Sequence, residues 1–482
     1  MLNARIIGRI LGVLLVLEGI FMLTIIPVSL YYNEGDLVPV AISAGITLGV
    51  GFILARIFKK SEGTVGKRDG YLIVTSSWIV FSLFGSLPFV IGGAIPSYTD
   101  AFFETISGFT TTGASILTDI ESMSHGLLFW RSMLQWLGGM GIIVLSLTIL
   151  PIVKVGSMQL FSAEVPGPTP DKLHPKIKET AKRLWLIYLF FTLAEALLLR
   201  LGGMNVFDAV CHSFTTMATG GYSTKNESIA AFNSPYIHYV ITIFMFIAGT
   251  NFSLAYFGMH GKLKKVFKNE EFIFYLSLLG VFIIGTAAVL HFSMGNTPES
   301  SFRDAAFQVV SIVTTTGYAT ADYYSWSPFL ILVIFILMFT GGSAGSTGGG
   351  IKMVRLLLLA KNSRQELNRL IHPNAIIPVR LNHKAVPKTV LNNVLAFIVF
   401  YFLITGVSAM IISAMGYDLS SSLSSVAATL GNIGPGLAQV GPTMNYAHFP
   451  DFGKWFLSFL MLLGRLELFT VLVLFTKWFY KN

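Results

Sequence analysis

Four short polar fragments recur at nearly even intervals along a chain that is otherwise strongly apolar. Residues 110–115 read TTTGAS and residues 314–319 read TTTGYA, and two weaker relatives are ATGGYS at 218–223 and GNIGPG at 431–436. An internal repeat is considered first, because it fixes how many copies of one structural unit the fold must hold. We therefore predict four repeats. Their reference glycines are predicted to be Gly113, Gly220, Gly317 and Gly434.

The segment before each fragment is repeated as well, and each contains an aspartate. These residues are Asp100, Asp208, Asp304 and Asp418. An aspartate at the N-cap of a helix accepts hydrogen bonds from free N–H groups, so each aspartate is predicted to begin a short helix. A helix of about three turns cannot cross a bilayer, which needs roughly 20 residues. Each unit is therefore predicted to be a full helix, a short re-entrant helix, an extended turn and a second full helix.

The apolar segments between the fragments predict an integral membrane protein. Hydrophobic residues make up 53% of the 482 residues and charged residues 12%, with a mean hydropathy of +0.69, which is outside the balance of a soluble domain. Membrane helices are predicted at 11–31, 41–58, 127–149, 188–201, 237–257, 272–290, 329–339, 390–412 and 455–475. We expect an all-α polytopic membrane protein with ten crossings. Two crossings lie in residues 1–68, and two in each repeat, at 69–153, 183–260, 271–362 and 388–480.

The charges indicate which side of the membrane each connection faces. Lys and Arg number 33 against 24 Asp and Glu, and the basic residues gather in alternate connections, near 5–9, 56–68, 172–183, 262–268, 352–388 and 477–481. The positive-inside rule then places both termini and the basic connections in the cytoplasm, and the charge does not indicate a nucleic-acid partner. The N-terminal apolar run is interpreted as the first membrane helix and not as a removable signal peptide. The single cysteine, Cys211, excludes an intramolecular disulfide.

Non-helical backbone at membrane depth is tolerated only where it is buried in protein or lines a watery cavity. Glycine lets the chain direct carbonyl oxygens inward, and rings of such oxygens can replace the hydration shell of an ion. The four turns contain no carboxylate, so they favour a dehydrated monovalent cation over a divalent one. The alternative, four unrelated turns at the membrane interface, stays open for any single fragment. The predicted main-chain ligands are Thr111, Thr112, Gly113, Ala218, Thr219, Gly220, Thr315, Thr316, Gly317, Asn432, Ile433 and Gly434.

Residues 340–350, TGGSAGSTGGG, lie in the middle of a predicted membrane helix and contain six glycines. Each glycine costs a helix about 1 kcal/mol against alanine, so a break is expected there. The spacing does not match a phosphate-binding loop, and close helix packing through small residues is the alternative to a break. Arg465 in the last membrane helix is costly unless it faces the bundle interior and finds partners.

Several fragments of the chain resemble those of a known family. The fragments TISGFTTTGAS, TTMATGGYS, VTTTGYAT and LGNIGPGL, together with WLGGMGIIVL at 136–145 and FTGGSAGSTGGGIK at 339–352, are similar to the membrane subunit of Trk-type potassium uptake systems, within the Trk/Ktr/HKT superfamily. The likeness covers the whole chain. It implies that the four units form a pseudo-fourfold pore with one filter glycine from each. Gly113 stands where members that favour sodium tend to have serine, so the resemblance implies potassium.

The resemblance also implies a gate and partners. The glycine-rich segment would be an intramembrane loop that obstructs the pore and moves on activation, through Gly341, Gly342, Gly345, Gly348, Gly349 and Gly350. Arg465 would be a cationic barrier and a tether for the loop carbonyls, and the alternative is an arginine that snorkels beside Glu467. A homodimer and a cytosolic nucleotide-binding regulatory ring are implied. Residues 165–176 and 361–384 are candidate docking connections on the cytoplasmic side of the inner membrane.

The remaining polar residues give no catalytic pattern. No Ser–His–Asp set, metal-spaced His/Cys group or paired carboxylates are found, so we expect neither an enzyme nor a cofactor bound by this chain, and potassium is the substrate. A proton- or sodium-coupled symporter stays open, as broken helices serve such carriers too, and a membrane-embedded scaffold is a third class. Interhelical hydrogen bonds are favoured over relay roles for Glu18, Glu195, His212 and Asn251. The fourth fragment departs most from the others, so strict fourfold coordination is in doubt.

Overall fold

The structure is a computed structural model that describes residues 2–59, 65–139, 141, 177–372 and 377–480. The proline-rich connector 165–176 and most of the segment 140–145 lie outside the described residues.

Two long helices precede the first repeat and pack closely along their length. The bounds are α1 (Ala4–Met22), α2 (Ile25–Tyr32) and α3 (Leu37–Ile57). Gly12 and Gly51 lie at the contact, where a Cβ on Gly12 would be 2.5 Å from the Ala55 nitrogen and one on Gly51 2.8 Å from the Val16 nitrogen. Small residues let the two backbones approach, which is how apolar helices associate within a membrane.

The remaining helices follow one order four times: a long helix, a short helix, a non-helical segment and a further helix. The first set is α4 (Lys67–Gly85), α5 (Leu87–Ile91), α6 (Tyr98–Phe109) and α7 (His125–Gly139). The second is α10 (Ile177–Leu201), α11 (Val206–Met217), η2 (Ser228–Ala231), α12 (Pro235–Ala248), α13 (Phe252–Met259) and α14 (Leu263–Val266). The third is α15 (Glu270–Met294), α16 (Pro298–Val313), η3 (Tyr323–Ser325), α17 (Pro328–Leu337) and α18 (Met353–Ile371), followed by the hairpin β1 (Arg380–Leu381) and β2 (Lys384–Ala385). The fourth is α19 (Lys388–Ala414), α20 (Leu419–Leu430), η4 (Ala438–Val440), α21 (Asp451–Arg465), α22 (Phe469–Leu472), η5 (Val473–Phe475) and α23 (Lys477–Tyr480).

Burial separates the short helices from the long ones. Every residue from 101 to 109 in α6 is buried, and α20 is buried in the same way from 424 to 430. The long helices instead expose apolar side chains such as Ile284 of α15 at 68% and Val399 of α19 at 63%. An apolar outer surface around a core that contains polar residues is expected of a protein surrounded by lipid.

By length and composition, six helices of the described residues can cross a membrane, or up to eight if each of two bent pairs counts as one span. The prediction of a polytopic helical membrane protein is therefore confirmed. Two predicted unbroken helices are wrong, because the chain bends by 110° between α12 and α13 and by 112° between α21 and the segment 469–475. The second bend lies at Glu467 and Leu468, whose φ values of 55° and 44° are left-handed, and the first lies at Gly249, where a Cβ would be 2.6 Å from Thr314 Cγ2. Close approach requires glycine there, and glycine weakens the helix.

The predicted N-caps are correct only for Asp418, whose carboxylate accepts from the Ser421 N–H. Asp100 and Asp208 lie in the first helical turn, and the caps are Ser97 and Asn205, three residues earlier. Asp304 lies within α16, which begins at Pro298 after the cap Thr297. Ser, Thr and Asn cap as well as Asp does, and an acidic residue also favours the positive end of a helix from within its first turn.

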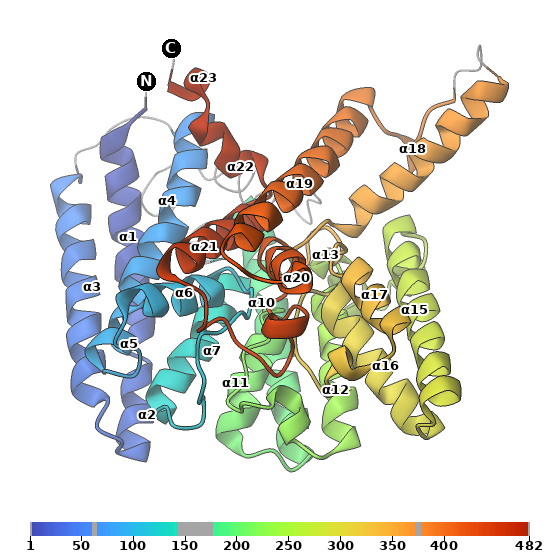
Figure 1. Cartoon of the computed structure of the whole chain (residues 1–482). Coiled ribbons are helices and arrows are strands. Elements are labelled where there is room, and N and C mark those ends of the chain that lie inside the picture. The colour runs from blue at the N-terminus through green and yellow to red at the C-terminus, as the bar shows by residue number, and fades with distance from the viewer. Residues whose placement is uncertain (1, 60–64, 140, 142–176, 373–376, 481–482) are drawn as a thin grey trace.

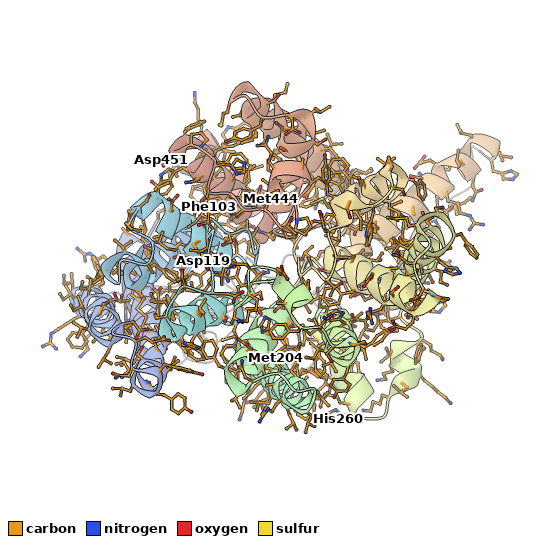
Figure 2. All side chains as sticks on the ribbon, turned by 60° about the horizontal axis from the view of Figure 1, so that its bottom comes forward. Phe103, Asp119, Met204, His260, Met444 and Asp451 are labelled. Atoms are coloured by element: carbon orange, nitrogen blue, oxygen red, sulfur yellow. The ribbon has the colours of Figure 1, made fainter. Side chains whose placement is uncertain are left out.

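The chain begins and ends its described helices on one face. In Figure 1 the start of α1 and the short α23 lie at the same end of the molecule, and α18 projects from that end away from the other helices. Figure 2, turned so that the opposite end comes forward, shows the segments of the four sets, coloured cyan, green, yellow and red, around a common centre. The non-helical segments that follow α6, α11, α16 and α20 contact one another.

Candidate functional site

The same backbone conformation recurs after each of the four short helices. A residue with a side chain adopts a positive φ in each: Thr111 (51°), Thr219 (53°), Thr315 (60°) and Asn432 (54°). Two residues later a glycine does so: Gly113 (82°), Gly221 (75°), Gly317 (80°) and Gly434 (97°). A positive φ is uncommon for residues that carry a side chain. Four recurrences at matching places show that the sequence repeat is a repeat of backbone conformation.

This geometry corrects one predicted position. The glycine of the second repeat that matches Gly113 is Gly221, because Gly220 does not have the positive φ. The predicted set Ala218, Thr219 and Gly220 is thus shifted by one residue, and the matching set is Thr219, Gly220 and Gly221. The other three predicted sets are in register.

Each fragment is tied to its own short helix by the same long-reaching backbone hydrogen bond. The residue before the left-handed glycine donates to the carbonyl five positions earlier. These bonds are Thr112 to Ser107 (2.8 Å), Gly220 to Thr215 (2.9 Å), Thr316 to Ser311 (2.8 Å) and Ile433 to Ala428 (2.8 Å). The fragment therefore leaves the C-terminal end of its helix, where the dipole is negative, in the same direction in every repeat.

The four fragments contact one another in a closed cycle. A Cβ placed on Gly113 would lie 2.2 Å from the Gly220 oxygen, and one on Gly221 would lie 2.0 Å from the Thr316 oxygen. The cycle continues in the other two repeats, with Gly317 against the Ile433 oxygen (1.8 Å) and Gly434 against the Thr112 oxygen (2.6 Å). Each glycine thus lies against the main-chain oxygen of the next repeat, and the fourth returns to the first. Only glycine leaves room for these oxygens.

Polar side chains fix the fragments from outside this ring. Arg131 of α7 donates from Nε to Glu104 Oε1 at 2.7 Å and from Nη1 to the Ser223 oxygen at 2.8 Å. Both partners of the ion pair are inaccessible, with side-chain exposures of 2% and 0%. Glu104 Oε2 accepts from the Ile116 N–H at 2.9 Å. A buried pair persists only with excellent geometry and further hydrogen bonds, and this one has both.

Two tyrosines join neighbouring repeats. Tyr222 of the second repeat donates to the Glu104 oxygen of the first at 2.7 Å. Tyr318 of the third donates to the His212 oxygen of the second at 3.3 Å. At the matching place the first and fourth repeats have Ala114 and Pro435. A different contact joins these two, in which Asn432 Nδ2 donates to Thr112 Oγ1 at 3.0 Å.

The predicted break in the glycine-rich segment is confirmed, because α17 ends at Leu337 and α18 begins at Met353. The loop between them, residues 340–350, lies against the C-terminal ends of three short helices, α11, α16 and α20. Thr347 Oγ1 donates to the Met217 oxygen at 3.1 Å, and the Gly349 N–H donates to Thr315 Oγ1 at 2.7 Å. A Cβ on Gly349 would lie 2.6 Å from the Gly431 oxygen. The other four predicted loop glycines that fall at close contacts are Gly341, Gly342, Gly348 and Gly350, while Gly345 faces Asn251.

Arg465 joins this loop to the first repeat. Its Nη1 donates to the Thr347 oxygen at 2.7 Å and to Thr111 Oγ1 at 3.0 Å, and its Nη2 donates to the oxygens of Gly138 and Gly139 at 2.6 and 2.9 Å. The predicted contact with a loop carbonyl is therefore present. The snorkelling alternative is wrong, because the neighbouring Glu467 pairs with Arg355.

The four other polar residues at membrane depth make contacts of different kinds. His212 bonds within its own repeat, from Nδ1 to the Asp208 oxygen (2.7 Å) and from Nε2 to Ser223 Oγ (3.0 Å). Asn251 caps α13 by accepting from the Ser253 N–H at 2.7 Å. Glu18 and Glu195 are buried, and no hydrogen bond meeting ordinary geometry reaches either carboxyl group from the described residues. Glu195 faces the side chain of Thr216.

Arg131, Glu104, Tyr222 and Tyr318 were missed by the prediction. The signal was present for the first two, since an ionisable residue within a membrane segment marks a functional site and needs a partner. Among the described residues no group of three His, Cys, Asp or Glu side chains could hold a metal ion. Main-chain oxygens are the polar groups that the four fragments place against one another.

Residues 45–480 match the family model TrkH, described as a cation transport protein. The chain is 43% identical to the Trk system potassium uptake protein TrkH of Escherichia coli (strain K12), with 100% of each covered. It is 35% identical to the Trk system potassium uptake protein TrkG of the same organism, with 100% of this chain and 99% of that protein covered. The crystal structure of the potassium transporter TrkH from Vibrio parahaemolyticus matches with a TM-score of 0.90 at 38% identity, covering 100% of both chains.

Proposed function

Because the chain belongs to the TrkH family of cation transport proteins, we propose that it carries potassium into the cell as the membrane subunit of a Trk-type uptake system. The relatives are transporters and not enzymes, and potassium is the substrate that their names give. The chain itself lies in the membrane, with the face that carries the start of α1, α18 and α23 in the cytoplasm.

The closed cycle of fragments carries the proposal. Its main-chain oxygens, from Thr112, Gly220, Thr316 and Ile433 and from the residues beside them, form a selectivity filter on the axis that the four repeats share. A carbonyl ring can replace the hydration shell of potassium, and the negative ends of four short helices favour a cation there. The repeats at 69–153, 183–260, 271–362 and 388–480 are the four quarters of this pseudo-fourfold pore.

The loop at 340–350 is the proposed gate. It lies on the cytoplasmic side of the proposed filter, against Met217 and Thr315. Arg465 joins it to Thr111. Conduction then requires this loop to move, and Arg465 places a positive charge on the path of the cation. Loops that move between discrete arrangements are a common means of gating.

We propose that the basic cytoplasmic face receives the rest of the system. The exposed end of α18 and the hairpin at 380–385 present Arg364, Arg380 and Lys384 there. A cytosolic nucleotide-binding ring and a second copy of the chain are the proposed partners, and no nucleotide binds to this chain itself. The name of the relatives as parts of a Trk system supports a complex of several subunits.

The test is ion flux through the purified full chain in liposomes. Uptake of rubidium, as a potassium substitute, should exceed uptake of sodium, and Gly113→Ser should lower that ratio because the added side chain meets the Gly220 oxygen. Equal fluxes of the two ions in the native protein would overturn the potassium assignment.

One observation favours a second candidate, a proton-coupled symporter. Glu18 and Glu195 are buried carboxyl groups that neighbour the short helices of the first and second repeats, and buried carboxyls serve as proton relays in transporters. Coupling predicts that an imposed pH gradient drives rubidium against its own gradient, and that Glu18→Gln or Glu195→Gln abolishes this. Rubidium movement that follows only its own gradient and the membrane potential would exclude this mode.

A further inference from the structure

The second repeat lacks a pair of threonines that supports the fragment in the first and third repeats. The ring position is the residue whose main-chain oxygen lies against the glycine of the neighbouring repeat. In those two repeats this residue is a threonine, and its hydroxyl bonds to the hydroxyl of the threonine two residues earlier. The pairs are Thr110 with Thr112 and Thr314 with Thr316, each at 2.8 Å between Oγ1 atoms. The matching residues of the second repeat are Ala218 and Gly220, which carry no hydroxyl. Something else must fill this space, because interiors are close-packed.

The side chain of Gln135 fills it from α7. Gln135 is fully buried, and a Cβ placed on Gly220 would lie 2.4 Å from both its Cδ and its Oε1. The amide therefore occupies the volume in which the first and third repeats hold a threonine. Gly220 is a glycine because Gln135 is there, although its own φ does not require one.

The Gln135 amide also bonds to the fragment on both sides of Gly221. Its Nε2 donates to the Gly220 oxygen at 2.6 Å, and its Oε1 accepts from the Tyr222 N–H at 3.0 Å. The Gly220 oxygen is the atom against which Gly113 of the first repeat lies. Among the hydrogen bonds of the described residues, no side chain donates to the matching oxygens of Thr112, Thr316 or Ile433. The second quarter of the ring is thus the one whose oxygen is held from behind by an amide.

We propose that Gln135 is a positioning residue that sets the Gly220 oxygen for cation selection, which rests on the proposed function of the ring as a filter. A carbonyl oxygen has two lone pairs, so it can accept the amide N–H and still face a cation. Selection between cations depends on the number, field strength and freedom of the ring oxygens. The hydrogen bond from the Gln135 amide restricts the movement of one of the four ring oxygens.

The support for the amide is rigid. Gln135 follows Arg131 by one turn of α7, and the buried pair of Arg131 with Glu104 fixes that turn. The central carbon of the Arg131 guanidinium lies 3.5 Å from the centre of the Tyr222 ring. Arg131 therefore also holds Tyr222, the residue whose N–H donates to Gln135. Positioning of a functional group depends on such support around it.

The experiment compares rubidium and sodium uptake by the full chain in liposomes. Gln135→Met keeps the volume and removes both hydrogen bonds, and we expect the rubidium-to-sodium ratio to fall about fivefold, the factor of one ordinary hydrogen bond. The matched control is Ser132→Ala, which alters a buried polar residue of α7 whose hydroxyl donates to the Leu128 oxygen of its own helix and also faces the buried thiol of Cys211. It should leave the ratio unchanged.

A second variant rebuilds the arrangement of the other repeats. In Gln135→Ala with Ala218→Thr and Gly220→Thr, a hydroxyl pair takes the place of the amide, and we expect the native ratio to return. A purely structural role would reduce the amount of folded protein and the total flux of every variant and leave the ratio alone. A native ratio in folded Gln135→Met, or a lost ratio in a folded rebuilt variant, would overturn the proposal.

Failure of this inference differs from failure of the proposed function. If the native protein does not prefer rubidium, the filter assignment itself is wrong. If the native protein and Ser132→Ala prefer rubidium and Gln135→Met does so equally, only the role of Gln135 is wrong.

Discussion

Arg465 Nη1 lies 2.7 Å from the main-chain oxygen of Thr347, so the last membrane helix of the chain holds the glycine-rich loop of the third repeat. The same nitrogen lies 3.0 Å from Thr111 Oγ1, which joins the loop to the first fragment through one guanidinium. Hydrogen bonds to charged groups contribute about 1.5–3 kcal/mol each. Movement of the loop must break at least one of them.

The first prediction concerns this contact. Arg465→Ala removes the donor and should raise rubidium flux through the chain without its partners by about 10-fold or more, the factor that 1.4 kcal/mol provides. Arg465→Lys keeps the charge but loses the planar fork, so its flux should fall between the two. Flux in liposomes is the measurement. An unchanged flux in Arg465→Ala would show that the arginine neither tethers the loop nor blocks the path.

The second prediction separates the ring glycines from other glycines with a positive φ. Gly221→Ala should abolish flux, because its Cβ would lie 2.0 Å from the Thr316 oxygen. Gly35→Ala is the control, since Gly35 has a φ of 82° and nothing within 4 Å of the added atom. Both variants strain the backbone by about 1–2 kcal/mol, but only the first should stop rubidium uptake. Equal loss in both would contradict the ring.

The third prediction concerns the buried ion pair. Arg131→Met leaves Glu104 without its charged partner and should lower the free energy of unfolding by about 3–5 kcal/mol. The matched control is Arg369→Met, which breaks a pair with Glu366 whose side chains are 34% and 54% accessible, and exposed pairs contribute about 0–1 kcal/mol. Thermal unfolding in detergent measures both. A similar loss in the two variants would mean that the pair of Arg131 contributes little.

The fourth prediction concerns pH and the cap of α20. Hydrogen bonds from the hydroxyl and N–H of Ser421 lower the pKa of the exposed Asp418 carboxyl. A lowered pKa in the folded state stabilises the fold above the unfolded value, about 3.9, and this contribution is lost as pH falls through the folded value. Asp418→Ala should therefore lower Tm at neutral pH through loss of a cap of about 1 kcal/mol, with a smaller difference from the native protein below pH about 4.

Asp418→Asn is the control for that measurement. Asparagine caps as well as aspartate does but does not titrate, so its Tm should lie close to the native value at neutral pH. A difference between native protein and Asp418→Ala that stays constant down to pH about 3 would show that the charge of Asp418 has no part in the cap.

The sequence predicted the order of a long helix, a short helix and a non-helical segment, which recurs four times, because this order follows from local patterns. Apolar length, polar fragments and a glycine cluster each act within about one helix, and the break at 340–350 is where the glycines require it. The position of Gly221 was also within reach. It follows Asp208 by 13 residues (221 − 208), the interval that separates Gly113 from Asp100 and Gly317 from Asp304.

The remaining features depend on contacts between distant parts of the chain. Nothing near Gly220 in the sequence indicates that Gln135 fills the space beside it, and the bend at Gly249 arises where that glycine meets another helix. Asp100 and Asp208 were wrongly predicted as caps because Ser97 and Asn205 compete for the same place. The filter and the gate stay predictions that the experiments above decide, and the partners stay predictions as well.

One polypeptide makes the whole cycle of glycines and oxygens. Each of the four glycine–oxygen contacts is therefore encoded separately. In a pore assembled from four identical chains a single codon change alters every quarter at once. Here the ring position is Thr112, Gly220, Thr316 and Ile433 in turn, so one quarter can vary while three keep their support. Under the proposed function of the ring as a filter, natural variation in such a protein can adjust its preference among ions in small steps, without a stage at which the whole ring is changed.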